Sequence, residues 1–174
     1  INLETGVEDI VSGVIANVKE NGDKALFEYA KKFDKAELNT YYQNGSRLSG
    51  HVSHYVPGVE LSTGSLGHGL SVGIGIAYAL KKKHNPAKVY VILGDGECDE
   101  GSVWEAMLFA NHNCLDNVVA IVDHNKMQSM DFCEKTISKE SLADKWKAFG
   151  WNVYDIDGHN HDELRNALND AKNS

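Results

Sequence analysis

Residues 91–129 of the chain read VILGDGECDEGSVWEAMLFANHNCLDNVVAIVDHNKMQS. Two short apolar runs in this stretch end in polar loops, and the residues between them have the length and composition of a helix. Short apolar runs bounded by turn-forming residues are typical of buried strands. We therefore predict strands at 88–93 and 118–122 and a helix between them at 101–112. A helical connection of this length indicates that the two strands are parallel.

The rest of the chain continues this alternation. Residues 34–57 are polar and rich in Tyr, Ser, Gly and His, which predicts an extended loop. Strands that alternate with helices predict an α/β fold, a doubly wound parallel sheet flanked by helices in three layers. The other segments with apolar residues at helical or strand spacing are predicted helices at 7–20, 25–33, 66–83, 141–149 and 161–172 and a predicted strand at 152–156.

Composition and charge exclude several classes of function. The chain has 174 residues and a formal net charge of −8 at pH 7. Its length suits one domain with a real core, and an acidic chain is a poor candidate for nucleic-acid binding. The three scattered cysteines argue against a disulfide framework or a zinc cage. Without a secretory leader or a membrane-length apolar run, we expect a cytoplasmic protein that makes no membrane contact.

The first candidate site residues follow the two strands directly. Asp95 lies between Gly94 and Gly96, and Asn125 follows about thirty residues later, after the second strand. The carboxyl ends of parallel strands are where ligands of such sheets bind. A carboxylate and an amide oxygen suit Mg²⁺, which completes its shell with phosphate oxygens and water, and the glycines allow close approach of a ligand. Gly-Asp-Gly alone is most simply a turn, but its place in this pair of loops favours a magnesium–diphosphate site.

Three stretches in order resemble the thiamine-diphosphate-binding N-terminal section of transketolase. A GDG motif followed about thirty residues later by Asn is the signature of thiamine-diphosphate enzymes, and Asp95 and Asn125 have that separation. Residues from about 40 to 172 look most like those transketolases whose N-terminal half is a separate chain. The matching stretches are GSRLSGHVSHYVPGVELSTGSLGHGLSVGIGIAYAL at 45–80, the stretch at 91–129, and SLADKWKAFGWNVYDIDGHNHDEL at 141–164.

The resemblance implies roles for individual residues. Asp95 and Asn125 would bind Mg²⁺ or Ca²⁺, with the backbone carbonyl of Met127 as a third protein ligand. His51 would contact the substrate as the catalytic histidine. The implied cofactor-binding residues are Gly64, Ser65 and Leu66 on the aminopyrimidine side, Gly94, Asp95, Gly96, Glu97 and Asn125 on the diphosphate side, and Glu100 and Glu105, which would link the cofactor sites of two subunits.

Some of these residues also have simpler interpretations. His51 lies in a polar loop, where a solvated histidine is common. Glu100 would favour the N-terminus of the helix that follows it, and Glu105 could be an ordinary charge on that helix. Cys98 lies near the metal in the sequence, but a hard cation does not select a thiolate. The tryptophans are most simply core or interface aromatics. Five further histidines are interpreted as structural or surface residues, with His68 as the most plausible exception because it neighbours the cofactor loop: His68, His112, His124, His159 and His161.

The first 38 residues differ from transketolase. The stretch VEDIVSGVIANVKENGDKALFEYAKKFDKAEL at 7–38 resembles the N-terminal helical segment of histidinol dehydrogenase. The zinc ligands and catalytic residues of that family lie beyond this segment, so no dehydrogenase activity follows from it. We therefore expect two parts, a helical segment of different origin at 1–38 and a partial transketolase-like domain at 39–174.

The resemblance implies a transferase that moves a two-carbon ketol unit between sugar phosphates, with thiamine diphosphate and Mg²⁺ as cofactors. The family's second, pyrimidine-binding domain supplies the glutamate that activates the aminopyrimidine ring, and we find no counterpart of it here. We therefore expect a C-terminal transketolase subunit or domain as partner, in a homo- or hetero-oligomer. The alternatives are an inactive fragment or chimera that keeps the fold, and a histidinol dehydrogenase-related chain. The stretches DHNKMQS and GSVWEA favour transketolase over two other groups of thiamine-diphosphate enzymes, the 2-oxo-acid dehydrogenases and deoxyxylulose-phosphate synthase.

Overall fold

The computed structural model describes residues 39–173 of the chain. Contacts divide the chain into two compact units, Ile1–Gly64 and Ser65–Ser174, which are described separately. The helices predicted at 7–20 and 25–33, like the whole helical segment at 1–38, lie outside the described residues, and the domain boundary at residue 38 stays a prediction. Residues 39–64 contain turns without a helix or strand, as expected for a polar loop. Within 39–173, no helix has the length and apolar character that a membrane span needs.

The second unit is built on a pair of parallel strands. Strand β1 covers Val89–Gly94 and strand β2 covers Val118–Asp123, with Val89 opposite Val118 and Gly94 opposite Asp123. Helix α4, Gly101–His112, connects them, preceded by the 3-10 turn η1, Glu97–Asp99. The strand–helix–strand unit predicted from the sequence is therefore confirmed to within a residue or two.

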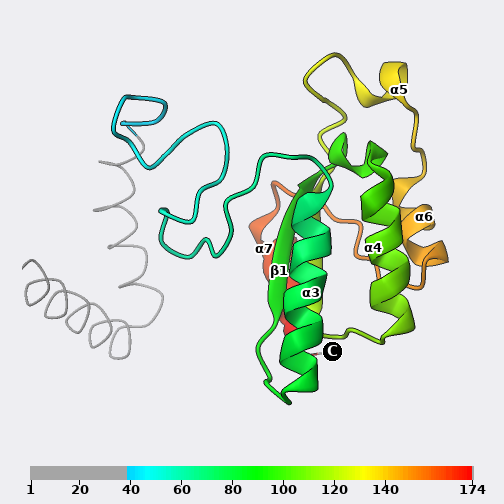
Figure 1. Cartoon of the computed structure of the whole chain (residues 1–174). Coiled ribbons are helices and arrows are strands. Elements are labelled where there is room, and N and C mark those ends of the chain that lie inside the picture. The colour runs from blue at the N-terminus through cyan, green and yellow to red at the C-terminus, as the bar shows by residue number, and fades with distance from the viewer. Residues whose placement is uncertain (1–38, 174) are drawn as a thin grey trace, which may run out of the picture. The chain divides into compact units, whose positions relative to one another are not determined.

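Helix α3, His68–Lys82, packs against β1 at close range (Figure 1). A Cβ atom built on Gly73 would lie 2.5 Å from Cγ2 of Val91, so only glycine lets the helix approach the strand this closely. Leu70, Ile74 and Ala77 on the same side of α3 are buried in the core. Gly73 of the predicted helix at 66–83 thus belongs to its packing against β1, whereas a Cβ atom at Gly75 would meet nothing within 4 Å.

Helices cover both faces of the strand pair, with α3 and α4 on one face and α7, His161–Asn173, on the other (Figure 1). The Lys88 ammonium donates a hydrogen bond to the carbonyl of Ala171 at 2.7 Å, which ties the last turn of α7 to the start of β1. The layers of the predicted α/β fold are therefore present. The core is formed by buried side chains from α3, β1, α4 and the short helix α6, Leu142–Ala148: Leu70, Ile74, Ala77, Val91, Leu93, Val103, Met107, Ala110, Leu142 and Trp146.

The predicted strand at 152–156 is wrong. Residues 151–157 connect α6 to α7 without regular secondary structure, and the sheet of the described region contains β1 and β2. The pattern that suggested a strand is real, because Val153 packs against the core while Tyr154 is exposed. Alternating burial requires only an extended chain, whereas a strand also needs ladder hydrogen bonds to a neighbour, and periodicity does not report those.

Candidate functional site

The two predicted loops leave the sheet at the same point. Gly94 and Asp123 form the last pair of the β1–β2 ladder, and the amide of Asp95 donates to the carbonyl of Asp123 at 3.2 Å. The first residue after β1 is therefore still held by the last residue of β2. Parallel pairing places loops 94–100 and 123–130 side by side at the carboxyl edge, as the sequence predicted.

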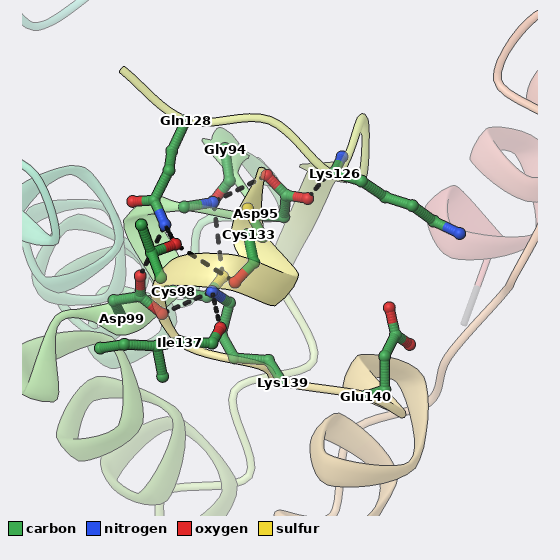
Figure 2. A network of polar contacts seen from close by, with 12 residues as sticks. Gly94, Asp95, Cys98, Asp99, Lys126, Gln128, Cys133, Ile137, Lys139 and Glu140 are labelled. Carbon is green, nitrogen blue, oxygen red and sulfur yellow. Dashed lines mark hydrogen bonds and ion pairs between the residues drawn. The ribbon is translucent and has the colours of Figure 1, made fainter. Parts of the chain in front are cut away.

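The carboxylate of Asp95 joins these loops. It is 1% exposed, its Oδ1 accepts a hydrogen bond from the amide of Gly96 at 2.8 Å, and its Oδ2 accepts one from the amide of Lys126, also at 2.8 Å. Lys126 adopts a left-handed backbone conformation with φ of 65°. Figure 2 shows that the Lys126 side chain points away from the carboxylate while its amide faces it. Asp95 is thus a structural anchor as well as a candidate ligand.

Asn125 is fixed by hydrogen bonds at both ends of its amide group. Its Oδ1 accepts from the amide of Met127 at 2.8 Å, and its Nδ2 donates to Oδ2 of Asp123 at 2.9 Å. Met127 is 60% exposed and its backbone pairs with Phe132 in an isolated antiparallel bridge. All three predicted metal ligands therefore lie in the two loops at the carboxyl edge of β1 and β2, with Asn125 exposed next to the buried Asp95.

Glu97 bridges two backbone segments. Its Oε1 accepts from the amide of Gly67 at 2.9 Å, and its Oε2 accepts from the amide of Gly94 at 3.3 Å. Gly67, with φ of 78°, is the N-cap residue directly before α3. Both carboxylate oxygens are thus engaged in holding the start of α3 against the end of β1. A direct contact between Glu97 and a cofactor stays a prediction.

Gly96 lies close against the loop that follows β2. A Cβ atom built at Gly96 would lie 2.7 Å from Cβ of Gln128, a distance that side chains do not tolerate. By contrast, a Cβ atom at Gly94 would meet nothing within 4 Å. The second glycine of the motif is therefore required for loop contact, and the first is not required on steric grounds.

The other predicted site residues are distributed over both units. In the first unit, His51 is exposed and its ring lies against Gly64, where a Cβ atom would meet Cδ2 of His51 at 2.8 Å. In the second unit, Ser65 and Leu66 are exposed and precede α3. The two acidic residues, Glu100 and Glu105, are exposed at the start and on the surface of α4. Their proposed roles toward cofactor, substrate or a second protomer stay predictions.

Sequence reasoning missed a buried polar network beside the site (Figure 2). The Lys139 side chain is 9% exposed and its ammonium lies 2.5 Å from Oδ1 of Asp99, while Oδ2 of Asp99 accepts from Nε2 of Gln128 at 3.4 Å. Gln128 also donates to the hydroxyl of Thr136. Asp99 and Lys139 are forty residues apart with no local motif around the lysine, so no pattern in the sequence pairs them.

The two buried cysteines near the site are protonated thiols at neutral pH. Burial, reinforced by the negative charge of Glu97, raises the pKa of Cys98 to about 12. The pKa of Cys133 is also raised. Burial is the largest cause, and a hydrogen bond with Asp95 and the negative charge of that carboxylate add to it. Neither thiol offers a thiolate at neutral pH, so the ligands available at this edge are oxygen atoms.

These residues fit a magnesium ion and a diphosphate. In residues 39–173, no side-chain cation forms an ion pair with Asp95, and a buried carboxylate without a cation is unfavourable. Its oxygens accept one backbone hydrogen bond each and keep lone pairs for a metal. The described residues contain no cluster of three or more His, Cys, Asp or Glu able to hold a metal. A metal here would therefore depend on Asn125, the carbonyl of Met127 and phosphate oxygens, which is the pattern Mg²⁺ favours.

Comparison with known proteins identifies the family. The family model "Transketolase, thiamine diphosphate binding domain" matches residues 22–174. The chain belongs to the transketolase family. The match includes residues 22–38, part of the segment expected to have a different origin, and the resemblance of residues 1–38 to histidinol dehydrogenase is not supported by it.

Individual relatives in the transketolase family agree with this assignment. The chain is 44% identical over 136 residues to a 6-deoxy-6-sulfo-D-fructose transketolase subunit of Clostridium sp. (strain MSTE9), covering 78% of this chain and 50% of that protein. It is 46% identical over 136 residues to an apulose-4-phosphate transketolase subunit of Phocaeicola vulgatus, covering 78% and 48%. The chain therefore spans about half the length of these curated relatives.

A solved transketolase shares the fold. The crystal structure of transketolase from Campylobacter jejuni superposes with a TM-score of 0.71 at 32% identity, over 80% of this chain and 23% of that chain. The transketolase-like α/β fold predicted from the sequence is thus confirmed. The described part of this chain corresponds to the thiamine-diphosphate-binding section of the family.

Proposed function

We propose that this transketolase-family chain binds thiamine diphosphate with Mg²⁺, or Ca²⁺ in its place, as the N-terminal section of an enzyme that transfers a two-carbon ketol unit between sugar phosphates. The observation that carries the proposal is Asp95, a buried carboxylate held between two strand-end loops without a side-chain cation in the described part of the chain. The family match supports the same cofactor.

The protein's part in this function is to hold the metal and the diphosphate. Asp95, Asn125 Oδ1 and the Met127 carbonyl would be the metal ligands, and the metal would offset the diphosphate charge. Gly96 would present its backbone to the diphosphate, because no side chain fits at that position. When bound, thiamine diphosphate would supply the nucleophilic carbon that ketol transfer needs, and the protein would contribute orientation and electrostatics.

The remaining predicted residues would surround the cofactor. Gly64, Ser65 and Leu66 would line its aminopyrimidine side, and His51 would contact the sugar phosphate. Glu97 would act through Gly67 and Gly94, whose amides it holds. Glu100 and Glu105 are exposed, which suits contacts with a second subunit.

A second domain or subunit would complete the site. Two relatives that match about half their own length are named as transketolase subunits, and this supports a C-terminal transketolase subunit or domain as partner. The partner would supply the pyrimidine-binding wall of the cleft. We expect a homo- or hetero-oligomer located in the cytoplasm.

The test is a titration of thiamine diphosphate against the full chain, with and without a C-terminal transketolase subunit, in Mg²⁺ and again in excess EDTA. We expect saturable binding that requires Mg²⁺ and that Asp95→Ala abolishes. Asp155→Ala, which removes an exposed aspartate in the connection before α7, is the control and should bind like wild type. Absence of binding both with and without the subunit would refute the proposal.

A mixture that binds cofactor yet transfers no ketol unit would support the alternative of an inactive fragment. The assay follows transfer from a ketose phosphate to an aldose phosphate after mixing this chain with the C-terminal subunit. We expect transfer that depends on Mg²⁺ and is lost in Asp95→Ala.

A further inference from the structure

We propose that Lys139 is a positioning residue for the metal-binding loop, acting through Asp99 and Gln128. The proposal rests on the proposed function, because the loop it positions is the one that would hold the metal. Lys139 is not among the site residues predicted from the sequence, and it lies forty residues after Asp99.

The Asp99 carboxylate is shared between two segments of the chain. One oxygen contacts the ammonium of Lys139 at 2.5 Å, and the other accepts from Nε2 of Gln128 at 3.4 Å. Gln128 follows Met127 directly, so Asp99 holds the far end of the metal-binding loop. Asp95 holds the near end of the same loop through the amide of Lys126. The loop is therefore fixed at both ends by carboxylates of the 94–100 loop (Figure 2).

Lys139 is itself held firmly. Its ammonium also donates to the carbonyl of Ile137 at 3.3 Å, and Lys145 of α6 donates to the carbonyls of Lys139 at 2.8 Å and Glu140 at 2.9 Å. A continuous series of polar contacts thus leads from α6 through Lys139 and Asp99 to the loop. These contacts connect α6, the segment that contains Lys139, η1 and the loop after β2, all within the second unit.

The pair is largely withdrawn from solvent, which separates a positioning role from ordinary surface pairing. Lys139 is 9% exposed and Asp99 is 17% exposed. Taking two charges out of water offsets much of their attraction, so such a pair contributes little net stability and serves to specify one arrangement. Removing one partner alone leaves an unpaired buried charge, whereas removing both charges does not. This difference allows folding and positioning to be measured separately.

The experiment compares Lys139→Met, Lys139→Arg and the double variant Asp99→Leu/Lys139→Met in the full chain, with the C-terminal subunit present. Mg²⁺-dependent binding of thiamine diphosphate and the thermal unfolding temperature are measured for each. We expect Lys139→Met to bind at least about tenfold more weakly and to unfold at lower temperature, with affinity partly restored in Lys139→Arg. The double variant should recover the unfolding temperature but not the affinity. Recovery of both would overturn the proposal, because the pair would then be only structural.

Lys135→Met is the matched control. It removes the exposed ion pair of Lys135 with Asp131 in the same region, and it should leave the affinity unchanged. An equal loss of affinity in this control would also overturn the proposal, because the effect would then not be specific to the buried pair.

Amide hydrogen exchange separates this proposal from the proposed function. Exchange at Lys126 and Gln128, measured without metal or cofactor, should be at least about tenfold faster in the double variant and unchanged in Lys135→Met. If wild type binds no thiamine diphosphate, the proposed function fails and the exchange rates alone decide the role of Lys139. Unchanged exchange in the double variant would refute it.

Discussion

The carboxylate of Asp95 accepts a hydrogen bond at 2.8 Å from the amide of Lys126, 31 residues later in the chain. The contact crosses from the loop after β1 to the loop after β2. Asp95 therefore closes the two loops together, and this role can be measured independently of its proposed role as an oxygen ligand to a cation. Closing the loops does not require any ligand.

Asp95→Ala is expected to destabilise the chain even without metal. The substitution leaves the buried amide of Gly96 and the partly buried amide of Lys126 without their acceptor, and each unsatisfied buried donor costs about 1–3 kcal/mol. We expect the free energy of unfolding in EDTA to fall by roughly 2 kcal/mol or more, measured by urea denaturation. A loss below about 0.5 kcal/mol would show that water replaces the carboxylate and that Asp95 is not an anchor.

Gly96→Ala is expected to separate the two loops. The new methyl group would lie 2.7 Å from Cβ of Gln128, so one loop must move. Overpacking of this kind costs about 1–3 kcal/mol, and we expect cofactor affinity to fall as well. Gly101→Ala is the control, because a Cβ atom there meets nothing within 4 Å. Equal effects of the two substitutions, measured by thermal unfolding and cofactor titration, would contradict the steric explanation.

Glu97→Ala is expected to loosen the first turn of α3. The amides of Gly67 and Gly94 lose the carboxylate that joins them, which we expect to lower the free energy of unfolding by roughly 1–2 kcal/mol. Faster amide exchange at Gly67 is the direct measurement. Glu105→Ala, on the exposed surface of α4, should leave that exchange rate unchanged. If the Gly67 amide exchanges at the wild-type rate in Glu97→Ala, Glu97 does not hold this amide in solution.

Stability should fall in alkaline solution because of Cys98. Its pKa is raised from 9.0 to about 12 in the folded chain, so the neutral thiol is favoured by folding. Below pH 9 the thiol is protonated in both states and contributes no pH dependence. Between pH 9 and 12 the unfolded chain releases this proton and the folded chain does not, so the free energy of unfolding falls by up to about 1.4 kcal/mol per pH unit.

The measurement is urea denaturation from pH 8 to pH 11 in wild type and Cys98→Ser. Other groups titrate in the same range, so the difference between the two slopes is the quantity of interest. We expect a shallower slope in Cys98→Ser. Identical slopes would mean that the buried thiol ionises as easily in the folded chain as in the unfolded one.

Periodicity and motif spacing predicted the elements that carry the site. The strand–helix–strand unit and helix α3 were predicted because their burial follows local patterns, with periods of about two and 3.6 residues. The closeness of Asp95 and Asn125 followed from parallel pairing. Residues 152–156 show the limit of this reasoning, since Val153 and Tyr154 alternate in burial without joining the ladder.

Residues that act through distant contacts could not be predicted in the same way. Lys139 has no local signal, because its partner Asp99 is forty residues away and its burial depends on how the segment after α5, Cys133–Thr136, folds back over η1. Glu97 was expected beside a cofactor because it follows the motif, but in the structure its two oxygens hold backbone amides. A motif gives the chemistry of a position, whereas tertiary packing decides which atoms the side chain reaches.

The pairing of β1 and β2, which ends at Gly94 and Asp123, limits how far the residues of the site can shift along the strands. A strand rises about 3.3 Å per residue, so a slip of one position between β1 and β2 would carry the Asp95 carboxylate out of hydrogen-bond reach of Lys126 and turn alternate side chains to the opposite face. Insertions are therefore tolerated only away from the strand ends and from the Met127–Phe132 bridge. The first two or three residues after each strand have no such freedom, and the spacing between Asp95 and Asn125 can vary only within the connection formed by α4 and its flanking turns.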